Sequence, residues 1–333
     1  MTGLGQLAII GGGGFGTALA VVSVRAGSKV ILRVRDPALA AAINKDHVNK
    51  AYLPDITLAP DIIATSESAG AGTAEAVLMA VPAQFLRETL SNHVAHLRPG
   101  APLLICAKGI EKGTHLLMHE VAHEIAPAHP IAILSGPSFA ADIARGLPTA
   151  VTLACADRAI GAMLAQSIAT QTFRPYLSSD IIGVEIGGAL KNVIAIACGI
   201  TEGRGLGESA RAALMTRGLA EMTRLAVKMG GQAATMMGLA GIGDLSLSCN
   251  SQQSRNFSLG LRLGKGERLE AVLAGSRGVF EGASTVGAAV QRAMREQVDM
   301  PICAAVHAIL NMGASIDAVI AELLARPMTS ETL

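Results

Sequence analysis

The sequence predicts an α/β domain built on a parallel sheet, followed by an all-α domain. Up to about residue 180, short apolar runs alternate with helical patterns, as they do in the β-α units of parallel sheets. Beyond residue 180 the apolar residues follow helical spacing, and no strand-like run of any length occurs. We therefore predict a first domain at residues 1–179 and a helical second domain at residues 180–333.

The elements can be placed from these patterns. Strands are predicted at residues 7–10, 29–34, 76–81, 103–107, 131–134 and 150–154. Helices are predicted at residues 17–26, 37–45, 83–96, 115–125, 181–200, 210–229 and 282–296. Pro82 and Pro137 are expected to end the strands before them, because proline has no N–H to donate to a β-ladder.

Composition argues against nucleic acid as a partner. The chain has 333 residues, with 27 Lys and Arg against 26 Asp and Glu, so the formal net charge is only +1. A charge near zero leaves no electrostatic footprint for a polyanion or an anionic membrane. The absence of Trp, with two Tyr and six Phe, also leaves few rings on which bases could stack.

Hydropathy raises the question of a membrane, since half of the residues are hydrophobic and the mean hydropathy is +0.44. The longest uncharged run, residues 1–24, carries seven glycines and no unbroken apolar core, so neither a membrane span nor a signal peptide is expected. The five cysteines form no C-x-x-C pair and the eight histidines show no metal-ligand spacing. We expect a cytoplasmic protein without a bound metal.

A glycine-rich loop follows the first predicted strand and opens the first predicted helix. Its sequence, from Gly11 to Gly16, satisfies G-x-G-x-x-G, and in this context the motif predicts a dinucleotide site in a Rossmann-type domain. Glycines let the backbone approach a pyrophosphate, whose charge is met by amide groups at the helix N-terminus. The candidate cofactor-binding residues here are Gly11, Gly13, Gly14, Phe15 and Gly16.

The end of the second predicted strand indicates which dinucleotide is bound. An acidic residue there accepts from a ribose 2′-hydroxyl, whereas arginine accommodates a 2′-phosphate. Here Arg33 and Arg35 precede the first acid, and Asp36 stands before Pro37, where it is better explained as a helix N-cap. We predict NADPH as the preferred cofactor, with Arg35 among its ligands and NADH as an alternative. Two solvated surface arginines are the competing interpretation.

A set of ordered motifs carries a family resemblance. The motifs are Ala107-Lys108-Gly109, Ser135-Gly136-Pro137-Ser138-Phe139-Ala140, Gly183 to Asn192 (GVEIGGALKN), Thr216 to Glu221 (TRGLAE), Gly241-Ile242-Gly243-Asp244-Leu245 and Ser254-Arg255-Asn256. From about residue 7 to residue 326, the chain closely resembles bacterial glycerol-3-phosphate dehydrogenase. That resemblance implies NAD(P)-dependent interconversion of dihydroxyacetone phosphate and sn-glycerol 3-phosphate, the backbone precursor of phospholipids.

Two lysines are the leading catalytic candidates. Lys191 lies on an apolar predicted helix, where partial desolvation suits an ammonium that protonates an alkoxide, and the resemblance assigns it the acid/base role. Lys108 follows a predicted strand at the edge of the sheet where ligands bind, and the resemblance implies contacts with both cofactor and substrate. Without the resemblance, a snorkelling lysine and a surface lysine would fit the same positions.

The remaining site residues are assigned by the resemblance. Substrate contacts are implied for Gly136, Ser138, Asp244, Ser254, Arg255 and Asn256, and cofactor contacts for Ala140, Arg255, Val279 and Glu281. Asp244 is expected either to contact a substrate hydroxyl or to orient Lys191 as an opposite charge. On the sequence alone, Ser138 could form a simple ST-turn, Asp244 could cap a helix, and Ser254 could start a solvated one. Phe85 could pack beside the cofactor, but a lone phenylalanine is more often core. Gly14 and Arg33 depart from the family pattern, which has Ser and an aromatic residue there in many members.

We therefore predict a two-domain dehydrogenase that takes a small phosphorylated substrate and forms a homodimer. Two alternatives remain open at this point. One is a related Rossmann reductase of another small hydroxy acid, for which the cationic Arg255 would have no phosphate to bind. The other is a dinucleotide sensor without turnover, against which Lys191 and Asp244 argue.

Overall fold

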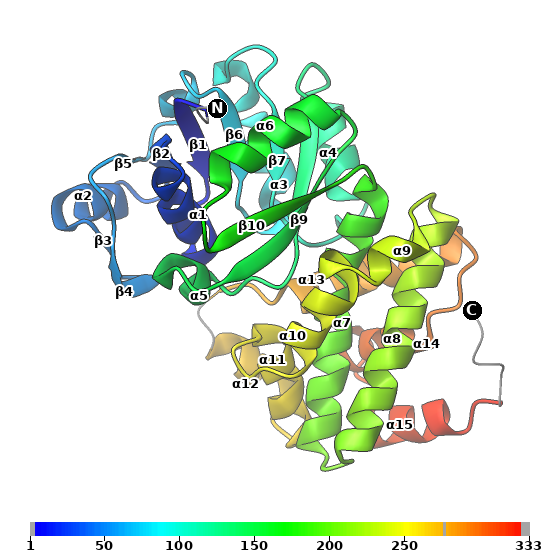
Figure 1. Cartoon of the computed structure of the whole chain (residues 1–333). Coiled ribbons are helices and arrows are strands. Elements are labelled where there is room, and N and C mark those ends of the chain that lie inside the picture. The colour runs from blue at the N-terminus through cyan, green and yellow to red at the C-terminus, as the bar shows by residue number, and fades with distance from the viewer. Residues whose placement is uncertain (1–3, 276–277, 328–333) are drawn as a thin grey trace. The chain divides into compact units, whose positions relative to one another are not determined.

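The computed structural model describes residues 4–275 and 278–327, and its chain divides into two compact units (Figure 1). The first unit comprises Met1–Ala107 and Met118–Ile181, and the second comprises Lys108–Leu117 and Ile182–Leu333. The segment that carries Lys108 thus groups with the second unit. The predicted functional division at residues 179 and 180 stays a prediction, because compactness alone assigns no role to either unit.

One sheet organises the described part of the first unit, with strand order β10-β9-β8-β7-β6-β1-β2-β5. Its strands are β1 (Gln6–Ile10), β2 (Lys29–Arg33), β5 (Ile62–Thr65), β6 (Ala76–Met79), β7 (Leu103–Ile105), β8 (Ile131–Ser135), β9 (Thr149–Cys155) and β10 (Phe173–Ser178). All neighbouring pairs are parallel except β8 and β9, so β9 and β10 run against the other six strands. The predicted parallel sheet is confirmed, with this reversed pair as an extension.

The helices of the first unit pack on the sheet (Figure 1). They are α1 (Gly14–Arg25), α2 (Pro37–Asp46), η1 (Ser68–Ala71), η2 (Ala83–Phe85), α3 (Leu86–Ser91), η3 (Val94–His96), α4 (Met118–Ile125), α5 (Ala140–Arg145) and α6 (Arg158–Ile168), with a small antiparallel pair of β3 (Val48–Asn49) and β4 (Leu53–Thr57). The predicted helix at 83–96 is wrong as one element, since it is divided into η2, α3 and η3. The helix predicted from His115 begins only at Met118, because His115 has a left-handed backbone with φ of 62°.

The described part of the second unit contains helices and no strand. They are α7 (Ile181–Gly203), α8 (Glu208–Lys228), α9 (Ala233–Met236), the π-helical turn η4 (Leu239–Gly243), α10 (Asp244–Cys249), α11 (Arg255–Gly264), α12 (Leu269–Ala274), α13 (Glu281–Arg295), α14 (Pro301–Asn311) and α15 (Ile316–Leu324). This confirms the predicted helical character.

Helix α7 is the centre of that unit's core. It is long and apolar enough to cross a membrane by length and composition, yet 83% of its most apolar 18-residue window is buried inside the protein. Its residues Val193, Ile194 and Ile196 are fully buried among side chains of the surrounding helices. The apolar surface of α7 is therefore accounted for by packing.

Candidate functional site

The glycine loop of the first unit is too tight for side chains at two positions. Gly11 has φ of +118°, and a Cβ there would lie 2.6 Å from the carbonyl oxygen of Ala80. A Cβ on Gly16 would lie 1.8 Å from the carbonyl oxygen of Gly11. Only glycine satisfies both positions, so these residues fix the path by which β1 turns into α1.

The same loop leaves the N-terminus of α1 suited to an anion. Gly13 is its N-cap residue and supplies no side-chain hydrogen bond, so the amides of Gly14, Phe15 and Gly16 lack the usual capping partner. A Cβ on Gly13 would meet nothing within 4 Å, and one on Gly14 would meet Ala140 at 3.6 Å. The loop therefore offers open backbone and a positive helix end, which fit the pyrophosphate of a dinucleotide.

Asn49 braces this loop, and sequence reasoning missed it. Its fully buried side chain donates through Nδ2 to the carbonyl oxygen of Gly12 and to Oγ1 of Thr17, both at 2.9 Å. The hairpin of β3 and β4 carries Asn49 into place. No motif surrounds it in the sequence, because its partners lie more than 30 positions earlier.

The end of β2 bears out the expected role of Asp36. Its Oδ1 accepts a hydrogen bond of 2.8 Å from the amide of Ala38 and caps α2. Arg35 is exposed, whereas Arg33 is partly buried and its Nε has no hydrogen-bond partner among the described residues. The Asp36 carboxylate is thus used as a helix cap. The guanidinium groups of Arg33 and Arg35 lie near the position where a 2′-phosphate would bind.

The turn after β8 differs from the ST-turn that the sequence left open. Gly136 has φ of +142°, and the hydroxyl of Ser138 donates to its carbonyl oxygen at 2.9 Å. The hydroxyl thus donates back to a preceding carbonyl, whereas in an ST-turn it would accept from the amide two residues further on, and the Ser138 oxygen can still accept a hydrogen bond. Phe85, explained above as core, is in fact 45% exposed, so that interpretation was wrong.

In the second unit, Gly187 sets the position of Asp244. A Cβ on Gly187 would lie 2.3 Å from the carbonyl oxygen of Ala240, so the turn η4 rests directly on the α7 backbone. Lys191 is one helical turn after Gly187 and shares its face of α7. Because α10 begins at Asp244, immediately after η4, the close approach brings this carboxylate to the lysine.

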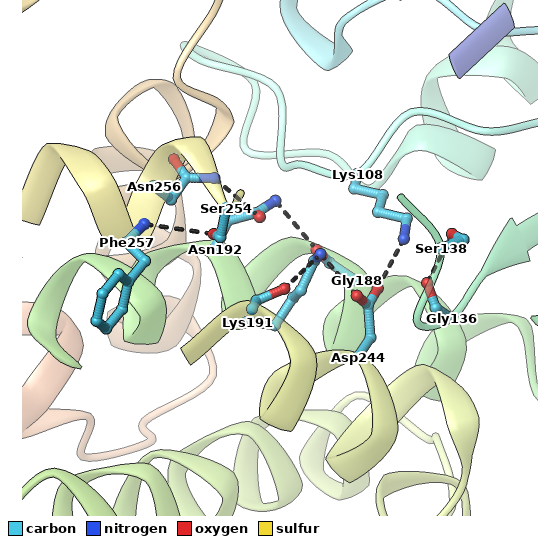
Figure 2. A network of polar contacts seen from close by, with 11 residues as sticks. Lys108, Gly136, Ser138, Gly188, Lys191, Asn192, Asp244, Ser254, Asn256 and Phe257 are labelled. Atoms are coloured by element: carbon cyan, nitrogen blue, oxygen red, sulfur yellow. Dashed lines mark hydrogen bonds and ion pairs between the residues drawn. The ribbon is translucent and has the colours of Figure 1, made fainter. Parts of the chain in front are cut away.

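Asp244 is held between two ammonium groups (Figure 2). Its Oδ2 accepts from Lys108 at 2.6 Å and its Oδ1 accepts from Lys191 at 2.7 Å, while Lys191 also donates to Oγ of Ser248 at 2.9 Å. The Asp244 side chain is 1% exposed, against 16% for Lys108 and 12% for Lys191. The predicted pairing of Asp244 with Lys191 is thus confirmed, and the structure adds Lys108 and Ser248 to it.

The charges in this cluster shift its pKa values in a definite direction. Burial alone would raise the pKa of Asp244, but the two lysines outweigh it and lower that pKa. Burial lowers the pKa of Lys191, and Lys108 lowers it further, while Asp244 opposes both effects. Lys191 is therefore a desolvated cation whose proton is held less tightly than in water, as a proton donor requires.

The start of α11 shows what Ser254 and Asn256 do in this structure. The hydroxyl of Ser254 caps the helix by accepting from the amide of Phe257 at 3.3 Å. Asn256 donates to Oδ1 of Asn192 at 2.9 Å and accepts from the amide of Gly282 at 3.0 Å. The bond between Asn256 and Asn192 joins α11 to α7 (Figure 2), and the bond from Gly282 joins α13 to α11. Both Ser254 and Asn256 therefore have a structural role, and one amide hydrogen of Asn256 is left available.

Arg255 lies beside the segment that precedes α13. A Cβ on Gly278, which has φ of +112°, would lie 2.5 Å from a terminal guanidinium nitrogen of Arg255. Val279 follows Gly278, and Glu281 is the first residue of α13. Three of the predicted cofactor contacts, Arg255, Val279 and Glu281, are therefore neighbours in the second unit.

Comparison with known proteins identifies the family. The family models for the N-terminus and C-terminus of NAD-dependent glycerol-3-phosphate dehydrogenase match residues 6–161 and 180–321. The chain is 51% identical over 327 residues to the glycerol-3-phosphate dehydrogenase [NAD(P)+] of Maricaulis maris, covering 98% of both chains. The chain belongs to the NAD-dependent glycerol-3-phosphate dehydrogenase family. The corresponding enzyme of Rhodospirillum rubrum is 52% identical and is covered to 94% of its length.

Solved structures agree with the family assignment. Glycerol-3-phosphate dehydrogenase from Coxiella burnetii is 36% identical to this chain, with a TM-score of 0.93 and coverage of 97% of this chain and 99% of that one. A ketopantoate reductase from Ralstonia eutropha shares the fold at 17% identity and a TM-score of 0.62. The family confirms the predicted fold class, the oxidoreductase activity and the use of NAD or NADP. The alternatives of another reductase or a sensor lose their support.

Two polar side chains that contact the candidate site residues were not assigned from the sequence. Ser248 is four residues after Asp244 on α10, so its face could have been inferred once the Asp244–Lys191 pair was known. Asn192 directly follows Lys191, but its buried bond to Asn256 spans 64 positions. Such long-range pairs leave no periodic signal in the sequence.

Among the described residues, no group of three or more His, Cys, Asp or Glu could hold a metal ion.

Proposed function

We propose that this protein reduces dihydroxyacetone phosphate to sn-glycerol 3-phosphate, reversibly, and thereby supplies the backbone of glycerophospholipids. The family assignment supports the reaction, and one observation supports the way in which it is performed. A buried carboxylate, Asp244, joins the ammonium groups of Lys108 and Lys191 in one cluster. A ketone reductase needs such cationic groups where negative charge develops on the carbonyl oxygen.

Lys191 is the acid/base residue of this proposal. Its ammonium has three hydrogens, of which two are used by Asp244 and Ser248, so the third is left for the substrate oxygen. During reduction, Lys191 donates its proton to the oxygen on C2, and during oxidation it accepts the proton back. Asp244 holds the lysine in position, and Lys108 adds a second positive charge for the substrate.

The phosphate of the substrate is assigned chiefly to Arg255. Its guanidinium can bind phosphate with two parallel hydrogen bonds, and it stands at the first turn of α11, where the helix dipole also favours an anion. Asn256 has one amide hydrogen to add, and Ser254 can contribute while it caps the helix. In the first unit, Gly136 and Ser138 are proposed to complete the substrate contacts.

The cofactor is assigned to the glycine loop with Arg35, Lys108, Ala140, Arg255, Val279 and Glu281, and NADPH is proposed as the preferred form. The nicotinamide, when bound, supplies the hydride that reduces C2. The open backbone at Gly13 and the uncapped start of α1 support the fit of a pyrophosphate. The capping role of Asp36 supports NADPH, since this acid is not left to read a 2′-hydroxyl.

The test is the oxidation of NADPH, then NADH, followed at 340 nm with dihydroxyacetone phosphate. Turnover should require the phosphate, so dihydroxyacetone should be a poor substrate. Lys191→Ala should lower kcat on the order of 10²–10⁴-fold, the usual contribution of a general acid. A Lys191→Ala enzyme with unchanged kcat would overturn the assignment, provided that its cofactor affinity is unchanged.

A homodimer in the cytoplasm remains part of this proposal. Large apolar side chains are exposed on the helical unit, among them Met312 at 73% and Leu324 at 81%, and a second copy of the chain would cover such a surface. The five cysteines are free and buried, as a reducing compartment favours. Light scattering after gel filtration tests the dimer, and cell fractionation tests the compartment.

A further inference from the structure

A cavity of about 350 Å³ lies in the second unit, within a volume range common for small-molecule sites. Three elements form its walls. The segment 108–117 contributes Lys112 and His115, α13 contributes Gly287 and Gln291, and α14 contributes His307. None of the residues of the proposed reaction lines it, although its first wall belongs to the segment that presents Lys108.

The lining of this cavity includes one cation, Lys112, and several hydrogen-bond donors. Lys112 and two imidazoles face it, and its described lining includes Ser284, Gln291 and Asn311 but no acidic residue. His307 donates through Nδ1 to Oδ1 of Asn311 at 3.0 Å, which orients the Asn311 amide and leaves its hydrogens for another acceptor.

Two arginines lie beside the cavity, of which Arg292 is ion-paired with Glu296 at 3.0 Å. Arg292 and Arg295 donate to the carbonyl oxygens of His115 and Thr114, both at 3.1 Å, and so tie the segment 108–117 to α13. Burial lowers the pKa of His115, and the charges of Arg295 and Arg292 lower it further, so their field reaches this wall. Nδ1 of His115 is buried with no hydrogen-bond partner among the described residues.

We propose that this cavity is a second binding site, distinct from the reaction site, for a small organic anion that carries a phosphate or carboxylate group. Lys112 supplies charge, and the side chains of Gln291 and Asn311 supply directed hydrogen bonds. The two histidines become better donors as an anion approaches, because a negative charge favours the imidazolium. The site does not depend on the substrate assignment, and binding can be measured without turnover.

The experiment follows the imidazole signals of the full-length protein by NMR during titration with inorganic phosphate and, separately, malonate. His115→Gln and His307→Gln assign the two signals. Both should shift and saturate with at least one probe, and the comparison of probes shows which headgroup is preferred. Signals that do not move with either probe would overturn the proposal.

Two variants and two controls locate the binding. Gly287→Met should fill the cavity, since a Cβ there would stand 3.5 Å from the His307 ring, an ordinary contact. Lys112→Ala should weaken binding by about tenfold through the loss of a charged donor. Lys228→Ala, at an exposed lysine on α8, should titrate like the wild type, as should Arg255→Ala. Loss of the shifts in Arg255→Ala would mean that they report only the reaction site, which would overturn the proposal, as would wild-type titration of both cavity variants.

Discussion

Lys191 and Asp244 are 53 positions apart in the chain, yet Nζ of the lysine lies 2.7 Å from Oδ1 of the aspartate. The pair depends on Gly187, since a side chain at that position would meet the backbone of η4 and displace the start of α10. The lysine's pKa therefore reflects a balance between its burial, the nearby Lys108 and this one carboxylate.

Asp244→Asn should shift the pH dependence of reduction to lower pH. Asp244 raises the pKa of Lys191, so its neutralisation leaves burial and Lys108 to lower that pKa unopposed. Because reduction needs the protonated lysine, kcat should begin to fall at a lower pH than in the wild type. A pH–rate profile checks this, with Asp317→Asn on exposed α15 as the control. A profile that keeps its midpoint would contradict the positioning role of Asp244.

Lys108→Met should have the opposite effect, so that kcat begins to fall at a higher pH than in the wild type. Lys108 lowers the pKa of Lys191, so the loss of its charge should raise that pKa and extend activity to higher pH. KM for dihydroxyacetone phosphate should rise as well, because a cationic substrate contact is lost. Opposite shifts in the two variants are the specific signature, since simple damage to the fold would not produce them.

Asn49→Leu should weaken cofactor binding by up to about thirtyfold, because two hydrogen bonds that brace the glycine loop are lost at about 1 kcal/mol each. Asn44→Leu is the matched control. Asn44 also makes two hydrogen bonds, both with the backbone of Ala64 and away from the loop. Calorimetric titration with NADPH should separate the two variants even if both lower the melting temperature. If the two variants bind NADPH with equal affinity, Asn49 does not brace the loop for the cofactor.

Arg35→Ala should reduce the preference for NADPH by about tenfold, the effect of losing one hydrogen bond to a charged phosphate. The ratio of kcat/KM values for NADPH and NADH measures it. Asp36→Ala should instead lower the stability of the first unit and leave that ratio unchanged, because Asp36 caps α2. If Asp36→Ala selectively lowers kcat/KM for NADH, Asp36 binds the ribose 2′-hydroxyl, and this assignment is wrong.

Glu221 should make stability depend on pH. This carboxylate is 1% exposed and accepts from the amides of Ile302 and Cys303 at the start of α14, at 2.6 and 3.1 Å. Burial raises its pKa from 4.5 to about 7, so the folded state holds the proton more tightly than the unfolded chain. The resulting stability is fully present below about pH 4.5 and is lost as the pH rises through about 7.

Glu221→Gln should abolish that part of the pH dependence, since the amide does not titrate. Melting temperatures from pH 4.5 to 8 check this, with Glu322→Gln on exposed α15 as the surface control. The slope of the melting temperature against pH should flatten only for the Glu221 variant. An unchanged slope would show that another group causes it.

Much of the fold could be predicted because its signals are local. The apolar run before Gly11 and the cap at Asp36 are readable within a few residues, and the structure has β1 and α2 there. Helix α6 was not predicted although Asp157 caps it as Asp36 caps α2, whereas two missed strands lack such signals. Strand β5 has only four residues, and β10 contains Pro175, which an edge strand tolerates but a sequence pattern does not suggest.

The sequence by itself determined the order of elements, the glycine loop and the identity of the residues available for chemistry, because turn chemistry and apolar periodicity act over short distances. Tertiary structure decided which of those residues meet. The Lys108–Asp244–Lys191 cluster, the Asn49 brace and the cap on α14 each join positions that are 32 to 136 residues apart. Their geometry follows from backbone contacts such as that of Gly187 with Ala240, which depend on packing rather than on any local pattern.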